Sequence, residues 1–213
     1  MPDLRFQVED AFATPNAAIP QLTFKVRIKN SESEPVHSIA LRAQVQIEPV
    51  RRRYTPTEQE RLKELFGEPE RWSKSVHPLL WTNASVNVSG FTGSTVVDIP
   101  VTCTFDFNVA ITKYIYGLDG GELPLSFLFS GTVFHAGRAG LQVAQIPWDR
   151  EASYKLPVQV WEQMMGEHYP NTAWLCLQRD AFDRLAEYKA RNNIASWEEA
   201  LERALDVVAE AKA

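Results

Sequence analysis

Alternation between apolar and polar side chains runs through the first two thirds of the chain. In Leu22 to Lys29 and in Ile39 to Glu48, every second residue is apolar and most of the residues between are polar. A period of two puts alternate side chains on opposite faces of an extended chain, which is typical of a half-buried β-strand. The same alternation, weaker in places, predicts further strands at Arg5 to Val8, Ala84 to Val88, Thr95 to Phe107, Leu123 to Phe134 and Leu141 to Ile146. About seven strands, each with one polar face, predict an immunoglobulin-like antiparallel β-sandwich.

Two helical segments interrupt this strand pattern. Thr55-Pro56-Thr57-Glu58 has the threonine cap, the first-turn proline and the glutamate of a capping box, and Gly67 is placed to end that helix. From Ile111 to Leu118, apolar residues recur at the spacing i, i+3, i+4 and i+7, which predicts a second short helix. The alternation before it also allows the preceding strand to continue.

The last third of the chain has a helical period. Pro157 opens an amphipathic segment that reaches Met165, Asp180 is placed to cap a second helix, and Ser196 to Glu199 is another capping box. We therefore predict a β-rich α+β fold with an inserted short helix and a C-terminal helical appendage. The expected domains are a β-sandwich with helical insertions over residues 1–156 and amphipathic helices over residues 157–213, packed on it or beside it.

Composition and charge mainly argue against certain classes of function. The chain has 213 residues, is 45% hydrophobic and has a net charge of −5 at pH 7, whereas a general nucleic-acid binder would show a basic surplus. The amino-terminal segment lacks the apolar core of a signal peptide, and no apolar run approaches the ~20 residues that span a bilayer. We therefore expect a cytoplasmic protein without membrane insertion and without a nucleic-acid partner.

The sequence has no recognisable catalytic or metal-binding motif. The four histidines are far apart, and neither a C-x-x-C pair nor a G-x-S-x-G elbow is present. The glycine-containing loop Ser89 to Thr95 lacks a lysine and leads into a strand, so it does not resemble a phosphate-binding loop. Cys103 and Cys176 each lie in an apolar pattern and are predicted to be buried free thiols. We predict no catalytic residue, no metal site and no cofactor.

The strongest candidate for a surface site is an arginine-rich segment. Arg51, Arg52, Arg53 and Tyr54 follow a predicted strand and precede the capped helix. Guanidinium groups make forked contacts with carboxylates, so the segment is suited to an acidic partner. The arginines are equally suited to pairing with glutamates of the following helix. In an extended segment, Arg51 and Arg53 should share one side and Arg52 the other.

Tryptophan is frequent, with six residues in the chain. Most are expected in the core, and any that stays exposed would be an interface anchor. We include Trp72 and Trp81 with Arg51, Arg52, Arg53 and Tyr54 as the candidate partner-binding residues.

Several strings in the chain are distinctive enough to indicate a family. RRRYTPTEQERLKELFGEPERW, GFTGST, LPLSFLFSGTVF, IPWDREASYKLPV and YPNTAWLCLQRDAFDRLAEYKA resemble an uncharacterised bacterial domain-of-unknown-function family. The genes of such families often lie beside those of nickel-iron hydrogenases. The resemblance implies an accessory protein of such a system, such as a scaffold, a maturation helper or an extra subunit. It supplies no catalytic residue.

Three functions follow from these observations, in order of preference. The first is a non-catalytic accessory or protein-interaction protein, whose partner is a hydrogenase subunit or maturation factor or a second copy of the chain. The second is a β-sandwich that binds a small ligand or carbohydrate, with tryptophans lining a concave face. The third is an enzyme of unrecognised type, since catalytic groups far apart in sequence can converge in space.

Overall fold

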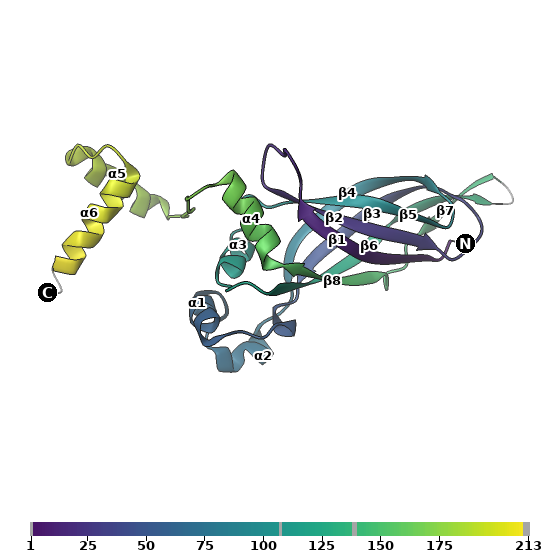
Figure 1. Ribbon diagram of the computed structural model, residues 1–213, viewed down its shortest axis with the longest axis horizontal. Helices are drawn as coiled ribbons and strands as arrows, with labels where there is room; N and C mark the ends of the chain where they lie inside the picture. The colour runs from purple at the N-terminus through teal and green to yellow at the C-terminus, as the bar shows by residue number, and fades with distance from the viewer. Residues whose placement is uncertain (1, 107, 138–139, 211–213) are drawn as a thin grey trace. The chain divides into compact units, whose positions relative to one another are not determined.

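The computed structural model describes residues 2–106, 108–137 and 140–210 (Figure 1). The chain folds into two compact units, Met1–Asn171 and Thr172–Ala213. The first unit contains every strand in the described part of the chain, and the second consists of two helices and the segment before them.

The first sheet has three strands. β1 (Leu4–Ala13), β2 (Gln21–Asn30) and β5 (Ser94–Thr102) pair antiparallel in the order β1-β2-β5. Leu22, Phe24, Val26 and Ile28 of β2 are fully buried, as their alternation predicts. The strand predicted over Thr95 to Phe107 is longer than β5, which ends at Thr102. Phe107, the last residue of the predicted strand, lies outside the described residues.

The second sheet is built around the long strand β6 (Glu122–Gly137). β3 (Val36–Ile47) pairs with one edge of β6 and with β4 (Leu79–Phe91) on its other side. The opposite edge of β6 is shared, since β7 (Gly140–Gln145) pairs with its second half and β8 (Glu151–Pro157) with its first half. All these pairings are antiparallel, which confirms the prediction of a β-rich protein with two antiparallel sheets and added helices.

β8 is a strand that the sequence analysis missed. Its inward positions are Ala152, Tyr154 and Leu156, of which Leu156 is fully buried and the other two are half-buried. Alanine is a weak apolar signal, and the strand is short, so the period of two is hard to recognise. The segment is held in an extended conformation by its antiparallel pairing with β6.

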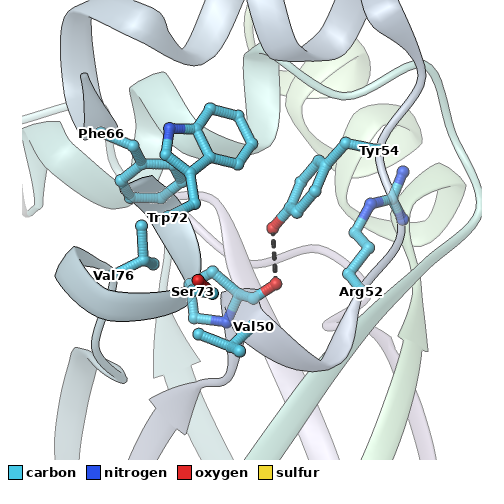
Figure 2. A pocket seen from close by; sticks show the side chains of 8 residues that line it. Val50, Arg52, Tyr54, Phe66, Trp72, Ser73 and Val76 are labelled. Carbon is cyan, nitrogen blue, oxygen red and sulfur yellow. Dashed lines mark hydrogen bonds between the residues drawn. The ribbon is translucent and has the colours of Figure 1, made fainter. Parts of the chain in front are cut away.

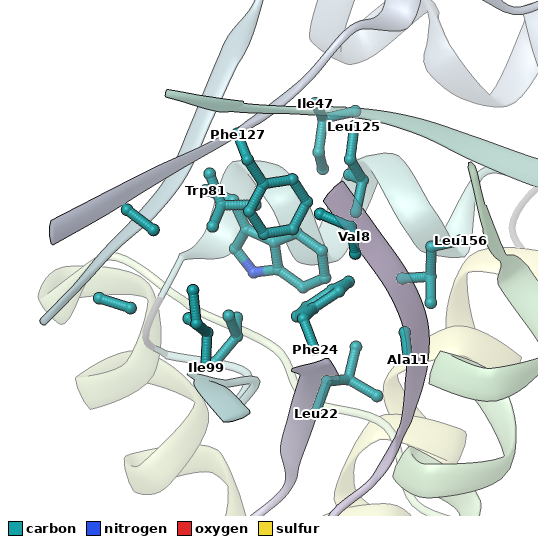
Figure 3. Packing of buried hydrophobic residues seen from close by; sticks show 14 of the residues in the cluster. Val8, Ala11, Leu22, Phe24, Ile47, Trp81, Ile99, Leu125, Phe127 and Leu156 are labelled. Carbon is teal, nitrogen blue, oxygen red and sulfur yellow. The ribbon is translucent and has the colours of Figure 1, made fainter. Parts of the chain in front are cut away.

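The core lies where the inner faces of the two sheets meet. Phe24 of β2 contacts Phe127 of β6 and Trp81 of β4, with ring centroids 5.1 and 6.4 Å apart and steeply inclined rings (Figure 3). Phe6 of β1 stacks on Phe129 of β6 at 4.3 Å. Burying a large apolar side chain stabilises a fold by about 1.5–3 kcal/mol, so this layer holds the two sheets together.

Between β3 and β4 the chain forms a helical insertion, which we define as residues 48–78. It comprises η1 (Pro49–Arg51), α1 (Pro56–Phe66), η2 (Pro69–Arg71) and α2 (Trp72–Ser75). The predicted capping box is confirmed, because the Glu58 backbone N–H donates to Thr55 Oγ1 at 3.2 Å and the Thr55 N–H donates to Glu58 Oε2 at 2.8 Å. Gly67 ends α1 at φ +74°, a conformation that favours glycine.

Two further helices belong to the first unit. α3 (Val109–Tyr116) is the helix predicted from the Ile111 to Leu118 spacing, and Asn108 caps it by accepting from the Ile111 N–H at 3.2 Å. α4 (Val158–His168) follows β8 directly and buries Trp161 and Met164. From its helical period, α4 is predicted to belong with the C-terminal helices. In the structure it belongs to the same compact unit as the two sheets.

The second unit contains α5 (Arg179–Arg191) and α6 (Trp197–Glu210). The predicted N-cap of α5, Asp180, is wrong by two residues, since Gln178 is the N-cap. Asp180 lies in the first turn, where its negative charge interacts favourably with the helix dipole. Ser196 caps α6 as predicted and accepts from the Glu199 N–H at 3.1 Å. None of the helices in the described ranges is long and apolar enough to cross a membrane.

Candidate functional site

The arginine segment lies at the start of the helical insertion, where Pro49 begins a single turn of 3-10 helix. Arg52 leaves that turn in an extended conformation, and its side chain is only 10% exposed. Arg51 and Arg53 are exposed on either side of it in the sequence, and the Arg51 side chain is 62% exposed. The segment therefore separates into one inward arginine and two outward ones.

The inward arginine ties three segments together. Arg52 Nη2 contacts Glu58 Oε1 at 2.6 Å and donates to the Gly120 carbonyl at 2.7 Å, and its Nη1 donates to the Glu122 carbonyl at 2.7 Å. Glu58 is 3% exposed and also accepts the Asp119 N–H at 2.9 Å. These bonds fix the start of α1 against the turn between α3 and β6.

Glu58 is held as a carboxylate. Burial raises the pKa of Glu58. The backbone N–H groups of Thr55 and Asp119 and the Arg52 guanidinium together lower it by more, so the pKa lies below the ordinary value of 4.5. Arg52 and Glu58 thus neutralise each other inside the insertion. Pairing with a glutamate of the following helix, the predicted alternative to partner binding, therefore holds for Arg52 but not for Arg51 and Arg53.

Tyr54 is the next inward residue and joins a second network. Its hydroxyl donates to the Pro49 carbonyl at 2.8 Å, so the Tyr114 hydroxyl is the donor in the 2.7 Å bond between the two tyrosines. Burial raises the pKa of Tyr54 to about 12 and raises that of Tyr114 as well. Both hydroxyls therefore keep their protons at neutral pH and act as structural hydrogen-bonding groups.

An open apolar pocket is formed where the insertion folds back on itself (Figure 2). We call it the insertion pocket, and its volume is about 160 Å³. Its main lining side chains come from η1, the arginine segment, α1, α2 and the residue that follows α2, namely Val50, Arg52, Tyr54, Phe66, Trp72 and Val76.

The walls of this pocket are fixed by specific contacts. The Trp72 indole Nε1 donates to the Gly67 carbonyl at 2.9 Å, and its ring meets those of Tyr54 and Phe66 edge-on at 5.2 and 5.4 Å. Val50 is 55% exposed and forms the rim. A rigid aromatic hollow with an exposed apolar rim can hold an apolar group from outside.

Five of the six predicted partner-binding residues meet in this region, and one does not. Arg52, Tyr54 and Trp72 line the insertion pocket, and Arg51 and Arg53 lie beside them in the chain. Trp81 is 4% exposed and lies between the sheets against Phe24, so it serves the core and offers no surface to a partner.

Sequence reasoning missed several residues of the site. Phe66 was recognised only as part of the apolar face of α1, and Val50 and Val76 gave no signal because their place depends on how η1 and α2 fold back. The exposed tryptophans were also not identified in advance, and they are Trp148, Trp174 and Trp197. Trp148 is 93% exposed in the loop between β7 and β8.

A second hollow lies on the outer face of the second sheet. Its volume is about 460 Å³, and its polar lining comes from Arg42, Ser85, Asn87, Ser130 and Gln145. Gly131 lies in it at φ +140°, and a Cβ there would approach the Ala40 carbonyl oxygen to 2.1 Å. We call this hollow the sheet groove.

The structure shows no metal centre within the residues that it describes, since no three His, Cys, Asp or Glu side chains there are grouped to hold an ion. Cys103 is buried, and its burial raises the pKa of its thiol to about 12. The prediction of a buried Cys176 is wrong, because the apolar segment Trp174 to Leu177 is exposed.

Comparison with known proteins identifies the chain at the level of family. A family model described as "Family of unknown function (DUF6084)" matches residues 1–213. The chain belongs to this family. The resemblance predicted from the sequence is confirmed to that extent, whereas no match links this family to hydrogenase genes, and that association stays a prediction. No curated protein matches the chain.

Solved structures give more distant matches. The CARDB domain of a Pyrococcus furiosus protein, in complex with di-metal ions, is 13% identical, with 73% of this chain and 92% of that chain covered and a TM-score of 0.30. A protein from Archaeoglobus fulgidus is 10% identical, with coverage of 70% and 96% and a TM-score of 0.29. A β-glucosidase from Kluyveromyces marxianus is 12% identical, with coverage of 72% and 15% and a TM-score of 0.26. At these values the three structures say nothing about the insertion pocket or the sheet groove.

Proposed function

We propose that this member of the family is a non-catalytic protein-interaction module, which binds a segment of a partner protein at the insertion pocket. The observation that carries the proposal is an open aromatic hollow beside two outward arginines. One apolar side chain of the partner would enter between Tyr54, Phe66 and Trp72, and acidic residues flanking it would pair with Arg51 and Arg53. The two sheets, arranged as an immunoglobulin-like sandwich, would serve as the rigid platform.

The size of the pocket favours a protein side chain over a free small molecule. Sites for drug-sized ligands have volumes of about 300–1,000 Å³, whereas the insertion pocket measures about 160 Å³. Buried aromatic residues lining a small pocket are also typical of the few contacts that dominate protein interfaces. An apolar anchor with charged flanks fits both features.

The charges around the pocket favour an acidic partner segment. Arg52 is neutralised by Glu58 at 2.6 Å, whereas Arg51 has a single long contact to Glu48 at 3.9 Å. Within the described residues, Arg53 forms no ion pair. Two exposed guanidinium groups, each on a residue adjacent in sequence to pocket-lining residues, would attract carboxylates to this segment and set the orientation of the bound partner.

The experiment is quantitative co-purification from the native cell with the wild type and three tagged variants of the chain. Val50→Asp puts a charge at the pocket rim, and Arg51→Ala/Arg53→Ala removes the outward cations. The control is Arg42→Ala, an exposed arginine on the sheet groove. We expect partner recovery to fall for the first two and to persist for the control, with melting temperatures nearly unchanged because these side chains are exposed. Recovery should also weaken with salt, since exposed charges are screened over about 8–10 Å.

Equal recovery by all three variants across a salt series would remove the insertion pocket from the account. The resemblance to families encoded beside nickel-iron hydrogenase genes indicates where to look for the partner, namely a subunit or maturation factor of such an enzyme. That setting rests on the resemblance alone.

The sheet groove favours a second candidate function, the binding of a small polar ligand such as a sugar. Its volume of about 460 Å³ lies within the range for small-molecule sites, and Ser85, Asn87 and Ser130 offer neutral donors and acceptors. Saturation-transfer NMR with a panel of mono- and disaccharides tests it. Signals that vanish in Asn87→Ala and Ser130→Ala would support this function, and the absence of saccharide signals would exclude it for that panel.

A further inference from the structure

The second unit exposes large apolar side chains on a very small scaffold. Within its described residues, seven are exposed, which are Trp174, Leu175, Leu177, Phe182, Trp197, Leu201 and Leu205. The unit spans 172–213, close to the lower limit of about 40 residues for a chain that folds around a core of its own. Ile194 and Ala200 are its buried apolar residues among those described, so most of the large apolar side chains of this unit are left exposed to solvent.

On α6 the exposed apolar side chains form a stripe. Trp197, Leu201 and Leu205 are spaced four residues apart, so they follow one side of the helix, and they are 40%, 38% and 69% exposed. At one end Trp197 is held in place, because Phe182 of α5 packs on its ring at 5.3 Å and Lys189 lies over it at 5.4 Å. Leu201 and Leu205 continue the stripe along the helix.

An acidic stripe runs directly beside the apolar one. Glu198, Glu202 and Asp206 also recur every four residues, each one position after an apolar residue, and all three are exposed. Arg203 does not neutralise them, because it pairs with Glu199 at 2.6 Å. Within the described part of the chain, none of the three carboxylates is in an ion pair.

We propose that α6 is the docking surface for a basic amphipathic helix of a protein partner. The partner's apolar face would cover Leu201 and Leu205, and its lysine or arginine flank would meet Glu198, Glu202 and Asp206. This is the helix-on-groove mode of recognition, in which apolar residues at helical spacing give the affinity and flanking charges give the orientation. It is separate from the insertion pocket, whose proposed ligand is acidic.

The charge pattern selects this partner over other covers. A second copy that paired α6 antiparallel with α6 would bring the two acidic stripes together, which is repulsive, and a parallel pair would leave both acidic stripes without a cationic partner. α5 offers few free cations to compensate, because Arg179 and Arg191 are paired with Asp183 and Glu187 on the same helix and Lys189 lies over the Trp197 ring. An anionic membrane or nucleic acid would be repelled by the same carboxylates.

The test uses a helical probe with the full-length chain. The probe is a fluorescein-labelled peptide of about 15 residues built from leucine and lysine with leucine on one face, long enough for about four helical turns. A scrambled peptide of the same composition and a leucine–glutamate peptide with the same pattern are the controls. Fluorescence anisotropy is measured over a salt series for the wild type and for Leu201→Gln/Leu205→Gln, Glu198→Gln/Glu202→Gln/Asp206→Asn, Arg184→Gln and Val50→Asp.

We expect the leucine–lysine peptide to bind the wild type and the scrambled peptide to fail. The leucine–glutamate peptide has the chemistry proposed for the insertion pocket, so any binding of it should be lost in Val50→Asp and unaffected by Leu201→Gln/Leu205→Gln. The leucine double variant should lose at least about tenfold in affinity, which corresponds to about 1.4 kcal/mol. The acidic triple variant should lose affinity at low salt and little at high salt. Arg184→Gln, on α5, and Val50→Asp, in the insertion pocket, should bind the leucine–lysine peptide like the wild type, so this result is independent of the proposed function.

Three results would overturn the proposal. The first is equal peptide binding by the wild type and the leucine double variant. The second is a dimer in analytical ultracentrifugation that Leu201→Gln/Leu205→Gln dissociates and that does not bind the peptide, which would assign the stripe to a second copy. The third is a chain that does not bind the peptide and whose melting temperature falls more for the leucine double variant than for Arg184→Gln. That result would show that Leu201 and Leu205 already contribute to the stability of the folded chain.

Discussion

Replacing Arg52 by alanine tests whether the inward arginine holds the insertion together. The substitution removes the 2.6 Å contact to Glu58 and the 2.7 Å hydrogen bonds to two carbonyls, those of Gly120 and Glu122. Glu58, 3% exposed, would keep backbone donors but lose its counter-ion. Leaving one member of a buried ion pair without its partner costs about 3–5 kcal/mol.

One feature of Arg52 reduces that cost. Its Nε is buried without a hydrogen-bond partner among the described residues, and burying such a group costs about 1–3 kcal/mol, which the substitution removes. We therefore expect the lower end of the range, a loss of about 3 kcal/mol in the free energy of unfolding. For a domain of this size, that loss lowers the melting temperature by about 6–12 °C.

The assay is urea unfolding with linear extrapolation, followed by both tryptophan fluorescence and circular dichroism so that agreement of the two probes checks two-state behaviour. The matched control is Arg51→Ala, since Arg51 is 62% exposed and lies 3.9 Å from Glu48. An exposed pair of this kind contributes less than about 1 kcal/mol. Arg52→Lys keeps the charge but loses the forked geometry and should fall between the two. Equal stability of Arg52→Ala and Arg51→Ala would refute the structural role.

Three other predictions concern hydrogen bonding, pH and thiols. Because the Tyr54 hydroxyl accepts from Tyr114, Tyr54→Phe leaves the buried Tyr114 hydroxyl without an acceptor and should lower the free energy of unfolding by about 1–3 kcal/mol. Tyr114→Phe removes only the donor and should lower it by about 1 kcal/mol. Urea unfolding that ranks the two variants in the reverse order would contradict the donor assignment. The lowered pKa of Glu58 stabilises the fold above the ordinary value of 4.5, and this stability is lost as the pH falls through the folded-state pKa. Below about pH 5, the stability of the wild type should therefore fall faster than that of Glu58→Gln, by at most about 1.4 kcal/mol per pH unit, and parallel pH curves would exclude the effect. Exposed Cys176 should react with a thiol reagent in the native chain, and Cys103, buried and with its pKa raised to about 12, only after unfolding; mass spectrometry of the labelled peptides separates the two.

Local patterns in the sequence determined most of the secondary structure. The alternation in Leu22 to Lys29 predicts which side of β2 is buried, because the side-chain period of a strand is fixed by its backbone geometry. The capping box at Thr55 and the glycine at position 67 predict both ends of α1, since each satisfies backbone groups within a few residues of itself. Alternation in an extended segment predicts that Arg51 and Arg53 share one side and Arg52 the other; their exposure agrees with this, although Arg51 ends a 3-10 turn and the extended conformation begins only at Arg52.

Tertiary structure decided what the candidate site is made of. Arg52 bonds with the Glu122 carbonyl, and Tyr54 with Tyr114, across 70 and 60 positions of sequence, and no local pattern specifies a contact at that separation. Trp72 lines the insertion pocket and Trp81 lies in the core, although both tryptophans looked alike in the sequence. β8 has a weak alternation of its own and is ordered by its hydrogen bonds to β6. Periodicity determines which face of its own element a side chain occupies, but which element covers that face depends on how distant strands pair and pack.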